Sequence, residues 1–274
     1  MKLIRPFFQL FWVACCALTL IAQTRLLLGQ STALGWLDGF VFGGTVFGYY
    51  CTHPKIWYRN LAWGAGFMGG ICFLMPLIDS SGSFWGQLIG LVPVVFWLAY
   101  YGFKRPGNSG LRSQLLAKPL TVALTWAWVT VLLPTLPTEW PNLSFLLLGR
   151  AAFIFALALA YDLCDADYDH RYGLKTLTRK LGFDRAFTLI YTSLALAACC
   201  VGTNLFLQVY ALPQALGLLL SLGFSAWWLR YLLQEKLWSV WQKPLIDGLM
   251  VLQFLLVLLL SKLPYPDRIP YFTL

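Results

Sequence analysis

The chain has 274 residues, of which 59% are hydrophobic and only 11% are charged. Soluble domains carry about 25% charged residues, so this composition excludes an ordinary soluble domain. The formal net charge of +9 is compatible with nucleic-acid binding, but in so apolar a chain it indicates lysines and arginines kept on the cytoplasmic side of a membrane. We therefore expect a lipid bilayer as the surroundings and no nucleic-acid partner. The seven cysteines form no CxxC pair, and they predict neither a disulfide framework nor a metal site.

Apolar runs close to the length that crosses a hydrocarbon layer recur along the whole sequence. The runs are continuous rather than alternating, which favours helices over a β-barrel. The first run follows Lys2 and Arg5 like a signal peptide, but no clear cleavage site follows it, so we expect an uncleaved first helix. The sequence predicts an all-α, polytopic membrane bundle in one transmembrane domain, residues 1–274, with nine spans at 7–27, 34–51, 60–78, 84–103, 119–137, 143–163, 186–203, 206–229 and 245–262.

Basic residues cluster in every second loop, and the loops between them are nearly uncharged or acidic. By the positive-inside rule this pattern places the N-terminus in the cytoplasm and the C-terminus outside, with Arg25 as the main exception. We expect an integral multi-pass protein of a bacterial inner membrane. In the third span, Gly66 and Gly70 have the small-xxx-small spacing that permits close helix contact.

The most charged stretch, "YDLCDADYDHRYGLKTLTRKLG", covers residues 161–182 and follows the sixth span directly. If the span continues as a helix, Asp162, Asp165 and Asp169 lie on one stripe, because they are spaced i, i+3 and i+7. Three like charges on one stripe require a multivalent cation or basic neighbours. Mg²⁺ typically takes one or two carboxylates together with phosphate oxygens of a substrate, so the stripe suits a metal-bridged phosphate ligand.

A solvated loop explains the same spacing equally well, with the acids paired to the basic residues that follow them: Arg171, Lys175 and Arg179. The segment "GLKT" adds Gly173 for a backbone bend and a lysine that can reach a phosphate. Basic groups beside a carboxylate stripe are what a diphosphate leaving group needs.

This stretch resembles the second aspartate-rich motif of the UbiA superfamily of intramembrane prenyltransferases, D-x-x-D-x-x-x-D followed by G-x-K-T-L and L-G. The residues that match in register are Asp162, Asp165, Asp169, Gly173, Lys175, Thr176, Leu177, Leu181 and Gly182. The resemblance implies a UbiA-like bundle that holds an isoprenyl diphosphate on Mg²⁺ at the cytoplasmic membrane rim. The isoprenyl group is then transferred from the diphosphate to an aromatic or other lipid-phase acceptor.

The resemblance also implies roles for individual residues. Asp162, Asp165 and Asp169 become catalytic metal ligands, and Lys175 and Arg179 become diphosphate contacts. The segment "LRSQLLAKPL" is similar to the basic segment that precedes the fifth helix of the family, which makes Lys118 a further diphosphate contact.

The first motif of the family, N-x-x-x-D-x-x-x-D, is expected after the second span, where this chain has "FGYYCTHPKIWYRN" without a carboxylate. Lys55 and Arg59 in this loop either bind diphosphate directly, which leaves Asp162 and Asp165 for one Mg²⁺, or are ordinary positive-inside residues. In the second case the chain is a catalytically inactive UbiA-like protein that binds a lipid or supports a membrane complex.

A transporter is a third class of function. Transporter sites usually lie near the bilayer midplane on broken helices, whereas the predicted charge here lies at the membrane rim and we expect no strongly ionisable residue at a span centre. Asp38 lies within the second span about one turn from the outer surface, and we interpret it as an acid that reaches water rather than as a site.

Overall fold

Helices are the regular secondary structure of the residues that the computed structural model describes, which are 4–52, 59–78, 89–96, 116–135, 143–165, 177–234 and 241–263. Six helical segments in these ranges are long and apolar enough to cross a membrane. They are Phe8–Leu27, Ala117–Thr135, Ser144–Cys164, Phe183–Phe206, Leu212–Gln234 and Gln242–Ser261. The chain is therefore an all-helical integral membrane protein.

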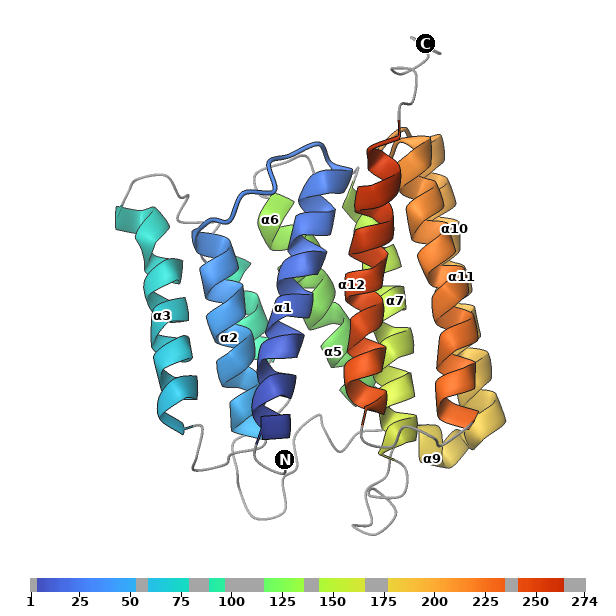
Figure 1. Ribbon diagram of the computed structural model, residues 1–274, viewed down its shortest axis with the longest axis horizontal. Coiled ribbons are helices and arrows are strands. Elements are labelled where there is room, and N and C mark those ends of the chain that lie inside the picture. The colour runs from blue at the N-terminus through green and yellow to red at the C-terminus, as the bar shows by residue number, and fades with distance from the viewer. Residues whose placement is uncertain are drawn as a thin grey trace.

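The helices lie side by side with their axes roughly aligned (Figure 1). In chain order they are α1 (Ile4–Leu27), α2 (Trp36–Thr52), α3 (Arg59–Ile78), α5 (Ala117–Ala127), the π-helix η3 (Trp128–Leu132), α6 (Leu133–Thr135), α7 (Ser144–Cys164), α9 (Leu177–Leu181), α10 (Phe183–Phe206), α11 (Leu212–Gln234) and α12 (Gln242–Ser261). Residues 89–96 are also helical. We call the end at which α1 begins the lower end, as in Figure 1, and the end at which α12 finishes the upper end.

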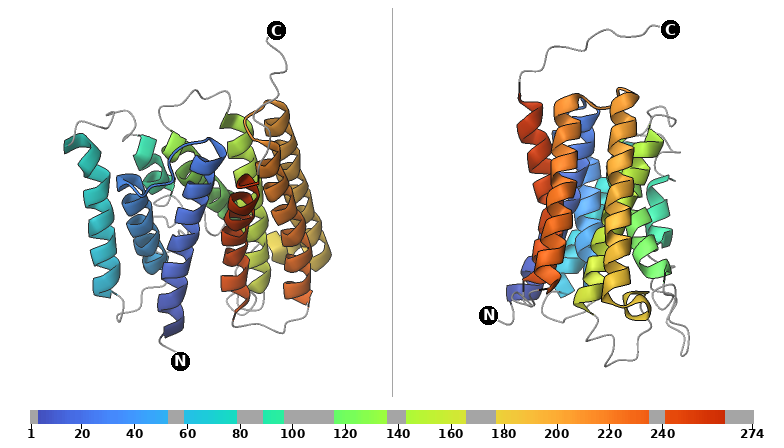
Figure 2. Two further views of the ribbon diagram at one scale, coloured as in Figure 1. Left: turned by 45° about the horizontal axis from the view of Figure 1, so that its top comes forward. Right: turned by 90° about the vertical axis from the view of Figure 1, so that its right-hand side faces the viewer.

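The centre of the bundle is formed by α7, which packs against α5, α10 and α12, while α12 also packs against α1 and α11. Large apolar side chains from these helices fill the interior, among them Leu20, Phe153, Ile190 and Leu229. The pair α2 and α3 lies at one edge of the bundle, and α10 and α11 lie at the opposite edge (Figures 1 and 2).

The observed helices agree with the predicted spans to within three residues at all the ends that the structure describes, except those of the eighth span. Of the predicted span 84–103, only residues 89–96 are among the described residues, and these are helical. The eighth span was predicted at 206–229, but α11 covers Leu212–Gln234.

The shift of α11 has a local cause in the connection that precedes it. Gln208 adopts a positive φ of 57°, which ends the preceding helix. Pro213 then lies in the first turn of α11, where its missing N–H costs nothing. The side chain of Gln214 accepts a hydrogen bond from the backbone N–H of Ala211 at 2.9 Å, which caps the new helix.

The fifth predicted span contains a change of helix type that the hydropathy does not indicate. The α-helix becomes a π-helix over Trp128–Leu132, just before Pro134. Proline has no N–H to donate to the carbonyl of Thr130, four residues earlier. The hydroxyl of Thr24 on α1 donates to that carbonyl at 2.7 Å. A hydrogen bond from a neighbouring helix thus stabilises the break.

The helices α2 and α3 approach each other closely at glycines, as the small-residue spacing predicts, although partly at other positions. A Cβ atom at Gly43 would lie 2.2 Å from the carbonyl oxygen of Ala65 and 2.9 Å from the Cα of Gly69. A Cβ atom at Gly66 would lie 3.0 Å from the ring of Phe47. One at Gly70 would meet nothing within 4 Å among the described residues, so the predicted close contact is not observed there.

Candidate functional site

The carboxylates of the charged stretch lie where α7 reaches the lower end of the bundle. Asp162 is in the last turn of α7 and is 2% exposed, so its charge is almost fully removed from solvent. The helix ends at Cys164, and Asp165 forms its C-cap, with φ −92° and ψ −1°. The prediction that a continuous helix carries the stripe onward from Asp162 is therefore wrong beyond Cys164. Asp169 lies outside the described residues.

Lys118 forms an ion pair with the buried carboxylate of Asp162. It is the second residue of α5 and precedes Pro119, which suits the first turn of a helix. A lysine in this turn lies at the positive end of the helix dipole, so a carboxylate beside it compensates both charges. The structure thus brings together two of the predicted site residues that are far apart in the sequence.

A second lysine–aspartate pair involves Asp165, about one helical turn after Asp162. The Nζ atom of Lys243 lies 2.6 Å from a carboxylate oxygen of Asp165, and both side chains are 33% exposed. Lys243 is the second residue of α12 and precedes Pro244. The sequences "AKPL" at the start of α5 and "QKPL" at the start of α12 therefore place one lysine each in the first turn of a helix that meets the end of α7.

A set of hydrogen bonds fixes the beginning of α12 against its neighbours. The hydroxyl of Tyr161 donates to the carboxylate of Asp247 and lies 3.2 Å from the carbonyl oxygen of Lys243. From α1, the indole of Trp12 donates to the carbonyl of Pro244 at 2.9 Å, and the thiol of Cys16 donates to the carbonyl of Asp247 at 3.4 Å. The ammonium group of Lys243 also lies 5.9 Å from the centre of the Tyr161 ring, within cation–π range.

Sequence reasoning did not identify Lys243, Tyr161 or Asp247 as site residues. The repeated Lys-Pro-Leu at 118–120 and 243–245 is a signal that could have identified Lys243. Asp247 is buried within α12, and its partner Tyr161 comes from 86 positions away in the sequence. No local pattern predicts such a pair.

The remaining predicted diphosphate contacts are not brought into this cluster by the described structure. Arg59 is the first residue of α3, at the edge of the bundle, and its side chain is exposed. Arg179 belongs to the short helix α9 at the lower end (Figure 1), and its side chain lies outside the described part of the chain. Lys55 and Lys175 also lie outside it.

The carboxylates present would suit one Mg²⁺ ion shared with a phosphate ligand. Asp162 and Asp165 are two oxygen donors one turn apart, and Mg²⁺ is commonly bound by one or two carboxylates plus substrate phosphates. Within the described ranges, no group of three or more His, Cys, Asp or Glu side chains is arranged to hold a metal ion. Each of the two carboxylates is also paired with a lysine, so a metal ion bound here would need a ligand that draws the lysines away.

The opposite end of the bundle holds a third ion pair. Arg25 at the end of α1 lies 2.9 Å from the carboxylate of Asp38 in the first turn of α2. The same carboxylate accepts a hydrogen bond from the N–H of Gly35 at 2.7 Å, and Arg25 donates to the carbonyl of Ala33 at 3.1 Å. Asp38 is buried, so the interpretation that it reaches water is wrong: it fixes the connection between α1 and α2.

The bundle interior also contains an ionisable residue that contradicts the sequence-based expectation. Arg150 is the seventh residue of α7 and is 5% exposed. We expected no strongly ionisable residue at a span centre, and Arg150, about one helical turn from the middle of the predicted span 143–163, contradicts that expectation. The absence of such a residue was one of two arguments against a transporter. The remaining argument is that the charged cluster lies at the lower end of the bundle rather than at its middle.

Comparisons of the chain with protein-family models, with curated proteins and with solved structures found no match. The functional conclusion therefore depends on the residues and contacts described above.

Proposed function

We propose that the chain is a divergent UbiA-type prenyltransferase that transfers an isoprenyl group from an isoprenyl diphosphate to an aromatic or other lipid-phase acceptor. In this proposal the lower end of the bundle faces the cytoplasm of a bacterium, and the helices form a nine-span, UbiA-like bundle in the inner membrane. The diphosphate head binds at the lower end, and the isoprenyl tail lies among the apolar helices.

One observation carries the proposal: two helices have a lysine in their first turn at the point where α7 ends with two aspartates. The N-terminus of a helix favours anions, because its free N–H groups and its dipole present positive charge. Lys118 and Lys243 add a full positive charge to each of two such ends. A diphosphate between α5 and α12 would therefore contact two ammonium groups and two helix N-termini.

The two carboxylates support this site in the absence of a ligand. Burying a lysine or an aspartate alone costs several kcal/mol, by an order-of-magnitude estimate, so each member of a pair keeps the other charged and in place. An arriving diphosphate replaces the carboxylates as partner of the lysines. Asp162 and Asp165 are then the residues that would hold Mg²⁺, which, when bound, would supply charge neutralisation of the leaving group.

The reaction itself makes few demands on the protein. The bond between the allylic carbon and the diphosphate oxygen breaks, and the electron pair leaves with the diphosphate. Lys118 and Lys243 stabilise the charge that develops on the leaving oxygen. The acceptor then forms a bond to the allylic cation and loses a proton. The apolar helices around the isoprenyl tail would exclude water from the allylic cation, which water would otherwise capture.

A second candidate is favoured by the ion pairs themselves. Lys118 and Lys243 connect the end of α7 to α5 and α12, and such links stabilise a bundle whether or not it is an enzyme. In this reading the chain is a catalytically inactive UbiA-like protein that binds a lipid or supports a membrane complex, and the lysines remain paired with the carboxylates at all times.

Binding of isoprenyl diphosphates to the purified protein in detergent tests the proposal. Geranyl, farnesyl and geranylgeranyl diphosphate are titrated with and without Mg²⁺ against the wild type, Asp162→Asn and Asp165→Asn. The matched control is Asp38→Asn, which removes a buried, ion-paired carboxylate at the other end of the bundle. We expect Mg²⁺-dependent binding that both lower-end variants weaken by at least about tenfold, which corresponds to about 1.4 kcal/mol, and that Asp38→Asn retains.

The outcomes separate the two candidates. If no isoprenyl diphosphate binds at any Mg²⁺ concentration, the prenyltransferase proposal is wrong. If the diphosphate binds but no diphosphate is released over hours with a panel of aromatic acceptors, the inactive relative is the correct description. Release that depends on both Asp162 and an added acceptor supports the enzyme.

A further inference from the structure

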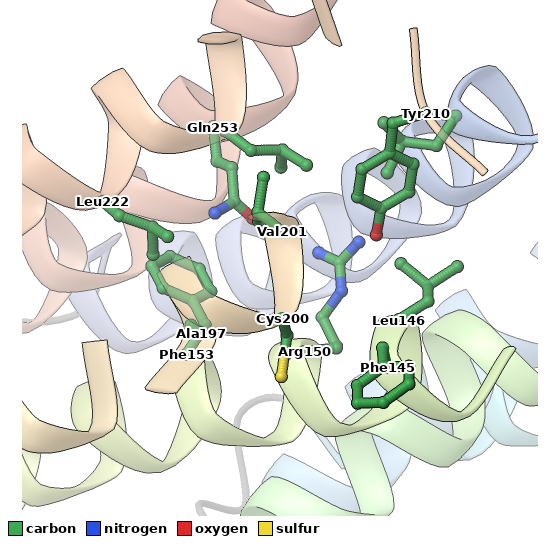
Figure 3. A pocket seen from close by; sticks show the side chains of 13 residues that line it. Phe145, Leu146, Arg150, Phe153, Ala197, Cys200, Val201, Tyr210, Leu222 and Gln253 are labelled. Atoms are coloured by element: carbon green, nitrogen blue, oxygen red, sulfur yellow. The ribbon is translucent and has the colours of Figure 1, made fainter. Parts of the chain in front are cut away.

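A small, partly open cavity lies toward the upper end of the bundle, and residues of α1, α7, α10, α11 and α12 line it (Figure 3). Its volume is about 30 Å³. Most of its wall is apolar, but three polar side chains reach it: Arg150 from α7, Tyr210 from the connection between α10 and α11, and Gln253 from α12.

Arg150 has no counter-charge among the described residues. None of the three ion pairs in the described ranges involves it, and its Nη1 atom is buried without a hydrogen-bond partner. Its Nη2 atom donates one long hydrogen bond, 3.4 Å, to the hydroxyl of Thr24. A buried and uncompensated guanidinium is costly, and in a membrane protein such a residue marks a functional site by default.

The other two polar groups also present donors to the cavity. The Tyr210 hydroxyl accepts a hydrogen bond from the side-chain amide of Asn204 at 3.1 Å, which leaves its own proton available to donate. Burial raises the pKa of Tyr210, so the phenol stays protonated at neutral pH. Gln253 is buried and lines the cavity, and its side-chain amide can donate through its NH₂ group. Figure 3 shows the guanidinium of Arg150 pointing toward the Tyr210 hydroxyl.

We propose that this cavity binds a monoatomic inorganic anion of the halide class, coordinated by Arg150, Tyr210 and Gln253. The three side chains offer a cation, an O–H donor and an N–H donor, and no carboxylate is among the described residues that line the cavity. A water molecule occupies roughly 10–15 Å³ of such volume, so the cavity has room for one or two particles of that size. A diphosphate, a fatty-acid carboxylate or a lipid phosphate is too large.

The site is separate from the candidate site at the lower end and does not rest on the proposed function. Arg150 and Asp162 are twelve residues apart on α7, which corresponds to about 18 Å along the helix. A bound anion would compensate Arg150 and connect α7 to the turn between α10 and α11. It would thereby stabilise the upper end of the bundle.

Thermal unfolding of the purified full-length protein in detergent tests the site, with chloride as the probe. The protein is heated in sodium chloride and in sodium gluconate at equal ionic strength, because gluconate is too large for the cavity. We expect chloride to raise the Tm by about 2–4 °C, the shift that corresponds to about 1 kcal/mol for a protein of this size. The shift should disappear in Arg150→Gln and persist in Arg230→Gln, a control arginine on α11 that is exposed to the surroundings.

Milder variants keep the test decisive if Arg150→Gln does not fold. Tyr210→Phe and Gln253→Leu each remove one donor and should each reduce the chloride-dependent shift by at least half. A wild-type protein with the same Tm in both salts overturns the proposal, since the cavity then holds water only. A shift that survives in all three variants also overturns it, because chloride would then act elsewhere. Bromide anomalous scattering at Arg150 in crystals would support it directly.

Glu139 precedes α7 in the sequence. The variant Glu139→Gln tests whether this carboxylate, rather than a bound anion, compensates the charge of Arg150. If Glu139 compensates Arg150, the wild type shows no chloride dependence and Glu139→Gln acquires it, which contradicts the proposal. If an anion compensates Arg150, Glu139→Gln and the wild type show the same shift.

Discussion

The ammonium group of Lys118 is paired with the carboxylate of Asp162, 44 positions away in the sequence, so that the first turn of α5 is joined to the last turn of α7. The pair lies on the boundary between the bundle interior and its lower surface: the side chain of Asp162 is 3% exposed and that of Lys118 is 22% exposed. This arrangement has consequences for stability and for ligand binding that can be measured separately.

The first prediction concerns the stability of this pair. Lys118→Met removes the cation beside a buried carboxylate. Breaking a fully buried pair costs about 3–5 kcal/mol, and we expect about 2 kcal/mol here because the lysine is partly exposed. The double variant Lys118→Met/Asp162→Asn should regain at least half of that loss, because no buried charge is left behind. Thermal unfolding in detergent measures both.

Lys262→Met is the control for this prediction, since Lys262 forms the C-cap of α12 at the opposite end of the bundle. It should leave the Tm unchanged within about 1 °C, as expected for a surface substitution. A Lys118→Met protein as stable as Lys262→Met would show that the ion pair does not stabilise the fold. Diphosphate binding provides an independent readout, because the double variant should remain unable to bind even though it regains stability.

The second prediction separates ligand binding from stability at Lys243. Its pair with Asp165 is one-third exposed on both sides, and exposed pairs contribute about 0–1 kcal/mol. Lys243→Met should therefore change the free energy of unfolding by less than about 1 kcal/mol. If Lys243 contacts the diphosphate, the same variant should weaken binding by about tenfold or more, equivalent to about 1.4 kcal/mol. Isothermal titration with farnesyl diphosphate makes the comparison.

A Lys243→Met protein that binds diphosphate like the wild type would remove α12 from the proposed site, even if Lys118→Met has lost binding. Binding of the diphosphate to the wild-type protein should also weaken as the salt concentration rises, because the two lysines are partly exposed to solvent. Salt-independent binding would contradict the assignment of these lysines as diphosphate contacts.

Much of the fold could be predicted because lipid imposes a simple rule on the sequence. A span must be apolar and of sufficient length, so hydropathy located most helix ends within three residues. Hydropathy does not show where an apolar segment interrupts a helix. Residues 207–211 are such a segment, and here the proline at 213 and the backbone of Gln208 decide where α11 begins.

The candidate site was predictable in part for a related reason. Asp162 and Lys118 were singled out from local motifs, and the structure places them together. Lys243 contacts Asp165 from 78 positions away, and Asp247 contacts Tyr161 from 86 positions away. Only tertiary packing determines which distant residues meet. Arg150 escaped notice because a single charge barely lowers the hydropathy of a long apolar run.

The third prediction tests the close contact of α2 with α3. Gly43→Ala places a methyl group within 2.2 Å of the Ala65 carbonyl, so the helices must separate. Overpacking of this kind costs about 1–3 kcal/mol. The neighbouring variant Gly44→Ala is the control, since a Cβ atom there meets nothing within 4 Å. It should be neutral or slightly stabilising, because alanine favours a helix by up to about 1 kcal/mol relative to glycine. Equal Tm values for the two variants would contradict the observed helix contact.

The fourth prediction concerns the hydrogen bond from Thr24 to the carbonyl of Thr130, which lies four residues before Pro134. Thr24→Val removes this donor within the membrane and also the acceptor of the long bond from Arg150. Interhelical hydrogen bonds in membrane proteins contribute about 0.6–1.7 kcal/mol, so we expect a loss of about 1 kcal/mol in the free energy of unfolding.

The loss of stability in Thr24→Val should depend on the proline at position 134. Pro134→Ala restores an N–H that can bond to the Thr130 carbonyl, so the carbonyl no longer depends on Thr24. In the Pro134→Ala background, Thr24→Val should cost less than half of what it costs in the wild type. Thr19→Val is the control, because the hydroxyl of Thr19 donates to the carbonyl of Cys16 on its own helix, at 2.8 Å, and its effect should not depend on position 134. Strict additivity of Thr24→Val and Pro134→Ala in a double-mutant cycle would show that the two helices are not coupled at this break.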